Sequence, residues 1–475
     1  MRISDIKDPT VSYFQGNFAP VQAQLSEPCI EVIGTVPEAL NGAFLRIGAN
    51  PVFVNDPESY HPFAGDGMIH EVVFEQGKVW YRNRFVETDG HLAEQEVGGL
   101  IWDGINTKPE DVEKYGPSKN IANTAMIFHG GKFLALQEGA RPFELKLPEL
   151  DPIGEVDFDG RLRHAFSAHP KIDPRTGELI SYGYSVTDAP YCAVSLINRE
   201  GELVHTTDVE IPKPVMMHDC AITENYTVLM DLPCVFDFER MASGKSILYF
   251  QPENGSRFGL LARGADGDKI RWFDVESCYC YHTVNAFEHG DEVVVEGCRS
   301  ERNSIGDETK PPPGDRSDLP MLYQWRFNLR TGEVVERKLD QDWGSEFARI
   351  NETFMGVRNR YAYAARIAGD NLESGFDGII KYDLVKETNS HYPYGPSRLG
   401  GEPIFAPKPN GKHEEDGWVI GFVWDEQLKR SECIILDAAN FEQGPVARVV
   451  MPARVPFGFH SAWVDQETWG ASLSR

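Results

Sequence analysis

Four of the thirteen histidines share a sequence context that suits metal binding. Each lies among apolar or small residues beside a segment expected to form a strand, where an unpaired imidazole is costly to bury. The four segments are Ser167-Ala-His169-Pro-Lys171, Val215-Met-Met-His218-Asp219, Cys280-Tyr-His282-Thr-Val284 and Phe457-Gly-Phe-His460-Ser461. Four neutral imidazoles without thiolate or carboxylate ligands suit a divalent first-row metal, with iron(II), zinc and copper all feasible.

A histidine-bound metal also predicts buried carboxylates nearby. Ligating histidines usually donate their other ring N–H to a carboxylate or a carbonyl, which orients the ring. Three glutamates lie in apolar or small-residue segments that could supply such acceptors. They are Glu138, Glu346 and Glu402.

The spacing of the histidines constrains the fold. They are 49, 64 and 178 residues apart, so neither one helix nor one hairpin brings them together. A β-propeller can do so, because the innermost strand of every blade faces the central axis. Seven blades over 475 residues allow about 68 residues each. The last interval then spans two or three blades that carry no histidine.

The pattern along the chain is mostly β, with helical insertions. Residues 78–85, 132–136 and 292–296 are rich in valine and aromatics and are bounded by turn residues. Asp or Asn followed by Gly-Glu predicts hairpins at 171–178, 197–202 and 327–333. Short helices are expected at 108–115 and 234–242. Since no biased linker interrupts the chain, we expect one domain over residues 1–475.

Composition excludes several function classes. The chain has 46 basic and 73 acidic side chains, a net charge of −27, and it contains no basic run, so nucleic-acid binding is not expected. Eight cysteines without a C-x-x-C pair are typical of a reducing compartment, and we expect a cytoplasmic protein. Neither a signal sequence nor a membrane-spanning apolar run is found.

Several segments, in order along the chain, resemble the carotenoid cleavage oxygenases, a family of non-haem iron enzymes. The resemblance is greatest to the plant-type carotenoid cleavage dioxygenases, through Met216-Met-His218-Asp219 and Ile222-Thr-Glu-Asn225. The other matching segments are Asn41-Gly-Ala-Phe-Leu-Arg-Ile-Gly-Ala-Asn-Pro51, Phe63-Ala-Gly-Asp-Gly-Met68, Ala122-Asn-Thr124, Ala168-His-Pro-Lys-Ile-Asp-Pro174, Arg349-Ile-Asn-Glu352 and Val455-Pro-Phe-Gly-Phe-His460.

The resemblance implies a seven-bladed propeller with an axial metal site, capped by a dome of helices and loops. It implies Fe(II) as cofactor, held by His169, His218, His282 and His460. Glu138, Glu346 and Glu402 match carboxylates bonded to ligand imidazoles, which leaves His169 without one. Thr124 matches a residue whose methyl group crowds a vacant coordination position. The pocket for substrate and O2 is expected to include Thr124, Gln137, Phe63, Trp102, Phe347 and Phe459, although the aromatic residues could equally be ordinary core.

The implied reaction is cleavage of a conjugated C=C bond by O2 to give two carbonyl products. Stilbene-cleaving relatives carry a lysine where this chain has Gln137, and a tyrosine in the preceding loop that is missing from residues 102–106. We therefore expect a carotenoid or apocarotenoid substrate, with a stilbene or phenylpropene as the alternative. A propeller scaffold without enzymatic activity is the remaining hypothesis. Because relatives with lipophilic substrates often touch bilayers, peripheral membrane contact is compatible with this family.

Overall fold

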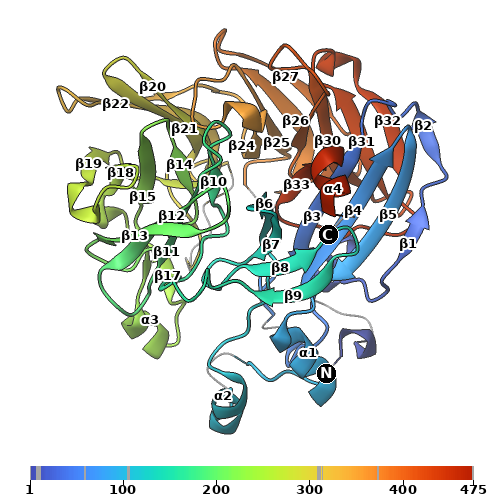
Figure 1. Ribbon diagram of the computed structural model, residues 1–475, viewed down its shortest axis with the longest axis horizontal. Helices are drawn as coiled ribbons and strands as arrows, with labels where there is room; N and C mark the ends of the chain where they lie inside the picture. The colour runs from blue at the N-terminus through green and yellow to red at the C-terminus, as the bar shows by residue number, and fades with distance from the viewer. Residues whose placement is uncertain are drawn as a thin grey trace.

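The structure is a computed structural model that describes residues 2–6, 12–57, 60–103, 107–306, 312, 314–371 and 374–472. Figure 1 shows the strands following one another around the molecule in chain order, from blue through green and yellow to red. Within the described residues the strands form seven antiparallel units of four or five strands around a common axis. This arrangement confirms the predicted seven-bladed propeller.

Four units are separate four-stranded sheets, each ordered from an innermost to an outermost strand. Their strands are β6 (Ala125–His129), β7 (Lys132–Leu136), β8 (Phe143–Lys146) and β9 (Asp151–Glu155); β10 (Lys171–Ile172), β11 (Leu179–Tyr184), β12 (Tyr191–Ile197) and β13 (Leu203–Glu210); β14 (Cys220–Ile222), β15 (Tyr226–Asp231), β18 (Ser256–Ala262) and β19 (Arg271–Val275); and β20 (Tyr279–His289), β21 (Glu292–Ser300), β22 (Met321–Asn328) and β23 (Val334–Lys338).

Two further units are joined into one ten-stranded sheet through β28 (Arg398–Gly400). They consist of β24 (Ser345–Arg349), β25 (Tyr361–Ile367), β26 (Phe376–Asp383) and β27 (Thr388–Pro393), and of β29 (Ile404–Pro407), β30 (Gly417–Asp425), β31 (Arg430–Asp437), β32 (Pro445–Val450) and β2 (Val32–Gly34).

The seventh unit joins the two ends of the chain. Its order is β33 (Ser461–Asp465), β3 (Gly42–Ala49), β4 (Gly67–Glu75), β5 (Lys78–Phe85) and β1 (Ser26–Pro28), so the C-terminal strand is innermost. Strand β33 pairs with β3, as Arg46 opposite Ser461. The ring therefore closes through backbone hydrogen bonds between residues more than 400 positions apart, which makes closure cooperative along the whole chain.

The predicted hairpins are present, and turn chemistry explains them. The segments 171–178, 197–202 and 327–333 join β10 to β11, β12 to β13 and β22 to β23, in that order. In the last, the Asn328 side-chain oxygen accepts from the Thr331 N–H at 2.8 Å, and Gly332 has a φ of +80°. An Asx turn followed by a left-handed glycine reverses the chain without strain.

Helices in the described residues lie between strands or after the last strand. Helices α1 (Asp89–Val97), α2 (Pro109–Tyr115) and α3 (Phe238–Ala242) lie between strands, and α4 (Gln466–Ser472) follows the last one. The expected helix at 108–115 corresponds to α2. The helix expected at 234–242 is wrong over its first three residues, which form β16 (Cys234–Phe236) paired with β17 (Leu248–Phe250). Asp237 starts α3 by accepting from the Glu239 and Arg240 N–H groups.

Strand direction decides which face the insertions cover. In an antiparallel blade the first strand begins, and the second ends, at the same face. Two connections therefore lie at the face where the innermost strands begin (Figure 1). One runs from β5 to β6 and carries α1 and α2, and the other runs from β15 to β18 and carries α3. This is the predicted dome.

A buried ion cluster holds α1 against the segment before β4. The Lys119 ammonium lies 2.5 Å from an Asp66 oxygen and 2.6 Å from a Glu94 oxygen, and His91 Nδ1 lies 3.3 Å from Asp66. All four side chains are at most 10% exposed. Buried charges need such pairing, so the cluster fixes the helical insertion to the propeller.

Candidate metal centre

All seven innermost strands place a polar or ligating residue near their first residues. The four histidines belong to the strands β10, β14, β20 and β33. His169 and His218 lie two residues before β10 and β14, His282 lies within β20, and His460 lies one residue before β33. Thr124 directly precedes β6, Glu346 lies in β24 and Glu402 lies two residues before β29. The 178-residue interval before His460 therefore contains two blades that contribute a glutamate instead of a histidine.

Register irregularities direct two of these side chains toward the axis. The pairing of β20 with β21 shifts between Cys280 and Thr283, around His282. The pairing of β24 with β25 shifts between Glu346 and Arg349. Because an extra residue in one strand reorients the neighbouring side chains, such bulges are common beside functional sites.

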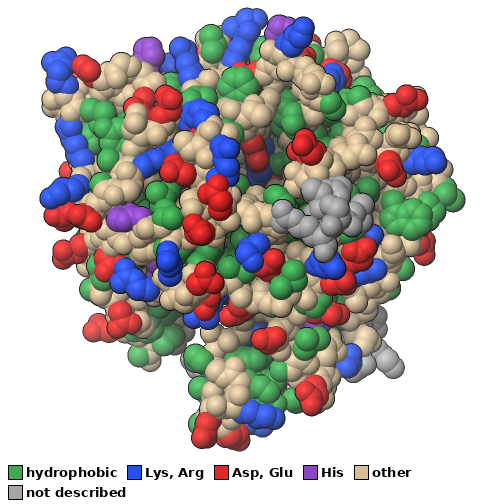
Figure 2. Space-filling model, viewed as in Figure 1, with side chains coloured by type: hydrophobic (Ala, Val, Ile, Leu, Met, Phe, Trp, Pro, Cys, Tyr) green, Lys and Arg blue, Asp and Glu red, His purple; other side chains and the backbone are tan. Residues whose placement is uncertain are grey.

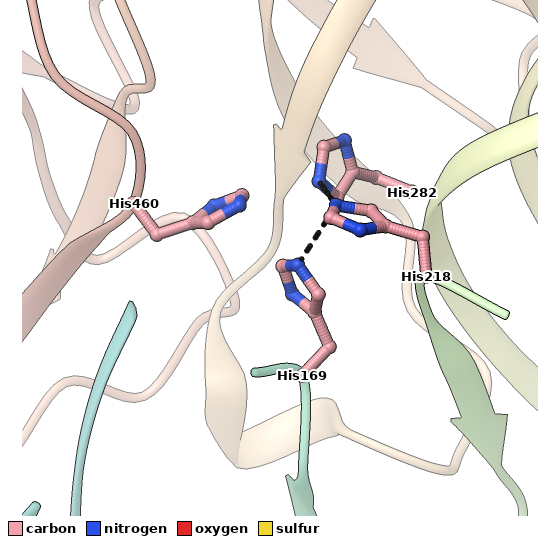
Figure 3. A group of neighbouring side chains, drawn as sticks. All are labelled: His169, His218, His282 and His460. Carbon is pink, nitrogen blue, oxygen red and sulfur yellow. Dashed lines mark hydrogen bonds between the residues drawn. The ribbon is translucent and has the colours of Figure 1, made fainter. Parts of the chain in front are cut away.

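The four imidazoles converge on one point (Figure 3). The Nε2 atoms of His169 and His218 are 3.1 Å apart, and those of His218 and His282 are 3.2 Å apart. One ring nitrogen from each of the four histidines lies within 4.8 Å of the others. Two nitrogens about 2.1 Å from one ion and at right angles to each other are about 3 Å apart. The spacing therefore matches ligands of a single metal ion.

Three of the four rings are oriented by carboxylates. Nδ1 of His218 lies 2.5 Å from Glu138 Oε2, Nδ1 of His282 lies 2.5 Å from Glu346 Oε2, and Nδ1 of His460 lies 3.0 Å from Glu402 Oε1. In the described part of the chain no carboxylate contacts His169. This pairing is the one that the family resemblance implies.

The hydrogen-bond chemistry of these histidines suits a cation between them. Since a carboxylate accepts, each Nδ1 carries the proton, and each Nε2 then points an unshared electron pair at its neighbours. Electron pairs about 3 Å apart repel one another unless a positive ion lies between them. Four imidazoles, three of them with a carboxylate acceptor on the outer nitrogen, fit a divalent first-row metal.

Burial keeps at least two rings neutral. His169 and His460 are 8% and 5% exposed. Burial, together with the neighbouring imidazoles, holds the pKa of His169 well below its usual value, and burial lowers the pKa of His460 to about 4. Burial also opposes the charged form of His218, but the adjacent Glu138 raises its pKa overall. The Glu138–His218 contact is therefore a charge-assisted hydrogen bond.

The residues expected in the pocket are placed unequally. The Phe347 ring centre lies 5.2 Å from those of both His282 and His460. The Phe63 and Phe459 rings pack edge to face at 5.2 Å, and Phe459 directly precedes His460 in the chain. Trp102 instead packs on Tyr115 and donates to the Gly116 carbonyl within the helical insertion. No contact joins Trp102 to the histidines among the described residues, so the structure does not place it in this pocket.

Thr124 and Gln137 both contact the segment that leads into β6. The Thr124 hydroxyl donates to Asn123 Oδ1 at 2.9 Å, and the Thr124 carbonyl accepts from the His460 N–H at 3.3 Å. Gln137 Oε1 accepts from the Ile121 N–H at 2.7 Å. Its amide oxygen is therefore engaged in holding the backbone. Residues 104–106, part of the loop considered for a tyrosine, lie outside the described residues.

Four contacts around the centre were missed by sequence reasoning. Tyr184 donates its hydroxyl to Glu138 Oε1, and Arg349 Nη1 lies 3.4 Å from Glu402 Oε1. Asp219 lies 2.6 Å from the Lys171 ammonium and accepts from the Thr283 N–H at 2.8 Å. Asp219 and Lys171 lie one and two residues after histidines, which is a usable signal. Tyr184 comes from the second strand of a blade, where no sequence pattern links it to the axis.

A cavity of about 340 Å³ extends from the histidines along the axis. His169, His282 and His460 line it at one end, together with Phe347 and Glu402. Its wall is formed by the innermost strands, through apolar side chains and a few charged ones. These include Ile127, Ile172, Val284, Ile350, Lys171, Asp219, Arg349 and Glu352.

Comparisons with known proteins agree with this centre. The family model of the retinal pigment epithelial membrane protein matches residues 18–465. The carotenoid 9,10(9',10')-cleavage dioxygenase 1 of Pisum sativum is 38% identical, over 96% of this chain and 90% of the relative. The carotenoid cleavage oxygenase of Mycobacterium tuberculosis is 34% identical, over 95% of this chain and 97% of the relative.

Solved structures share the architecture. Pseudomonas brassicacearum lignostilbene dioxygenase superposes with a TM-score of 0.89 at 29% identity, covering 97% of this chain and all of the other. Cobalt-substituted Synechocystis ACO gives a TM-score of 0.83 at 26% identity, covering 94% of this chain and 97% of the other. The chain therefore belongs to the carotenoid cleavage oxygenase family, and it is an enzyme of the dioxygenase class.

Proposed function

We propose that this enzyme uses Fe(II), held by His169, His218, His282 and His460, to cleave a conjugated C=C bond of a carotenoid or apocarotenoid. The observation that carries the proposal is the convergence of four imidazole nitrogens within 4.8 Å. Bound iron would supply the redox-active centre at which O2 reacts with the alkene. All four electrons that reduce O2 come from the two alkene carbons, so the products are two carbonyl compounds and no reductant is consumed.

The protein's own residues would position the reactants and tune the ligands. Glu138, Glu346 and Glu402 hold the Nδ1 protons and fix each ring. The Phe347 ring offers an apolar wall beside His282 and His460, against which a polyene can lie without losing a hydrogen bond. A conjugated chain has no polar group to satisfy, so apolar contacts and exclusion of water suffice to orient it.

A stilbene or phenylpropene is the second candidate substrate. The relevant observation is the TM-score of 0.89 with a lignostilbene dioxygenase. Gln137 argues against this substrate, because its side chain is neutral and its amide oxygen already accepts from the Ile121 N–H. We therefore favour the polyene.

A product assay tests the substrate class. The iron-loaded protein would be incubated under 18O2 with an apocarotenal, β-carotene, resveratrol and isoeugenol, and the aldehydes identified by mass. We expect polyene aldehydes that carry the label, and no turnover by His218→Ala. Predominant aromatic aldehydes such as vanillin would overturn the polyene preference. If no substrate were cleaved by protein that retains iron, the proposed activity would be wrong.

We also propose a cytoplasmic enzyme that takes up substrate at a membrane surface. All eight cysteines are free and buried, as suits a reducing compartment. In the described residues no helix is long and apolar enough to cross a membrane. Leu92 and Val97 on α1 and Val112 on α2 are 46%, 55% and 37% exposed. Figure 2 draws this lobe at the lower edge, with hydrophobic side chains among acidic ones.

Vesicle flotation tests the membrane contact. The wild-type protein is expected to float with zwitterionic vesicles at high salt, because apolar side chains drive the contact and a net charge of −27 opposes attraction to anionic lipid. Serine at positions 92, 97 and 112 should abolish flotation. Equal flotation of the wild-type protein and this triple variant would refute the proposed surface.

A further inference from the structure

The three carboxylates that orient the histidines are themselves held in three different ways. Glu138 accepts a hydrogen bond from the neutral Tyr184 phenol. Glu346 accepts from the Phe347 N–H at 2.8 Å, and its Oε1 has no hydrogen-bond partner among the described residues. Glu402 alone is paired with a cation, through Arg349 Nη1 at 3.4 Å.

Arg349 links the axial cavity to this carboxylate. It is the last residue of β24, it lines the cavity, and its side chain is 24% exposed. Its second terminal nitrogen is paired with Glu352. The guanidinium is therefore fixed at both ends between two carboxylates, as its planar, forked donors allow.

Glu402 needs such support more than an exposed glutamate would. Its side chain is only 2% exposed. Oε1 receives both the His460 Nδ1–H and Arg349, and Oε2 accepts from the Ser461 N–H. A buried carboxylate without a cation is strongly disfavoured in its charged form. Arg349 thus holds the Glu402 carboxylate turned toward His460.

We propose that Arg349 is a positioning residue for His460: through Glu402 it holds the fourth histidine in the orientation that binds the metal. The proposal rests on the metal site proposed above and does not depend on the substrate. Removing the guanidinium frees the Glu402 carboxylate to rotate away from His460. His460 then loses the acceptor that fixes both its tautomer and its ring plane. Loss of an outer hydrogen-bond partner typically weakens metal binding by about 10- to 100-fold.

The test compares Arg349→Met with a matched control in the same blade. Arg366 in β25 pairs with Asp377 at 2.7 Å and 2.9 Å, with side chains 11% and 31% exposed, and no histidine contacts it among the described residues. Co(II) dissociation constants would be measured by competition with a chelator, and folding by thermal denaturation. We expect about 10- to 100-fold weaker binding for Arg349→Met, near wild-type binding for Arg366→Met, and partial recovery for Arg349→Lys.

Two further readouts separate positioning from general stability. In a double-mutant cycle, Arg349→Met should weaken Co(II) binding no further in a Glu402→Gln background, because both changes break the same chain of contacts. In paramagnetic proton spectra of the Co(II) protein, Arg349→Met should move the His460 Nδ1–H resonance. Tyr184→Phe should instead move the Nδ1–H resonance of His218.

The outcomes distinguish the two proposals. If the wild-type protein bound no Co(II), the metal site itself would be wrong, and the role of Arg349 with it. If the wild-type protein bound Co(II) and Arg349→Met bound it equally tightly, only the role of Arg349 would be wrong. Equal weakening by Arg366→Met, or additive losses in the cycle, would also refute positioning through Glu402.

Discussion

Asp219 joins three of the strands that carry histidines, and its removal should destabilise the propeller measurably. It is 1% exposed. It accepts from the Cys220 N–H at 2.7 Å, from the Thr283 N–H and hydroxyl at 2.8 Å each, and from the Lys171 ammonium at 2.6 Å. These partners lie in β10, β14 and β20. Asp219→Ala would leave the Lys171 ammonium, whose side chain is 14% exposed, without its partner.

The magnitude follows from the uncompensated charge. Breaking a buried ion pair by removing one partner costs about 3–5 kcal/mol. Unfolding entropy of about 2.1 cal/mol/K per residue, over 475 residues, amounts to about 1 kcal/mol per degree. We therefore expect Asp219→Ala to lower the Tm of the metal-free protein by about 3–5 °C, measured by calorimetry. Metal binding should also weaken, because three histidine strands lose their common contact.

Two comparisons test the reasoning. Asp231→Ala breaks a pair with Arg257 (2.7 Å) inside one blade, where the arginine is 27% exposed, so it should cost less stability and leave metal binding unchanged. Adding Lys171→Met to Asp219→Ala removes the orphaned charge and should restore part of the Tm. A Tm for Asp219→Ala no lower than that of Asp231→Ala, or no recovery in the double variant, would refute the explanation.

Three further predictions concern protons and the metal. Burial raises the pKa of Glu71 from 4.5 to about 8, so the stability linked to this proton is present below pH 4.5 and lost as the pH rises toward 8. The stability of Glu71→Gln relative to wild type should therefore increase between pH 5 and pH 9; a constant difference in Tm would contradict this. Burial opposes the charge of Glu432, but hydrogen bonds from Arg448 and Arg398 lower its pKa to about 2. The contribution of this carboxylate to the free energy of unfolding is present above pH 4.5 and lost toward pH 2. The stability of Glu432→Gln should therefore depend less on pH in this range than that of the wild type, and an equal pH dependence would contradict the prediction. His218→Ala should abolish metal binding, measured by elemental analysis, whereas His129→Ala, whose ring bonds the Gly177 carbonyl, should not.

Local signals in the sequence were reliable where short-range physics decides. Residues 78–85 and 132–136 match β5 and β7 at both ends, because short runs rich in apolar and aromatic residues and bounded by turn residues specify a strand locally. Asn328 and Gly332 likewise specify their hairpin. The error at Cys234–Phe236 has a long-range cause, since these residues pair with Leu248–Phe250 across an insertion.

The sequence by itself singled out four histidines as candidate metal ligands, through their apolar settings and the resemblance to a known family. Which glutamate serves which histidine was decided only by the tertiary structure. Glu346 and Glu402 reach His282 and His460 because consecutive innermost strands are neighbours on the axis, across 64 and 58 residues of chain. The roles of Arg349 and Asp219 depend on the same closure of the ring. Contacts between strands of different blades have no local pattern, and they exist only once the last strand pairs with the first blade.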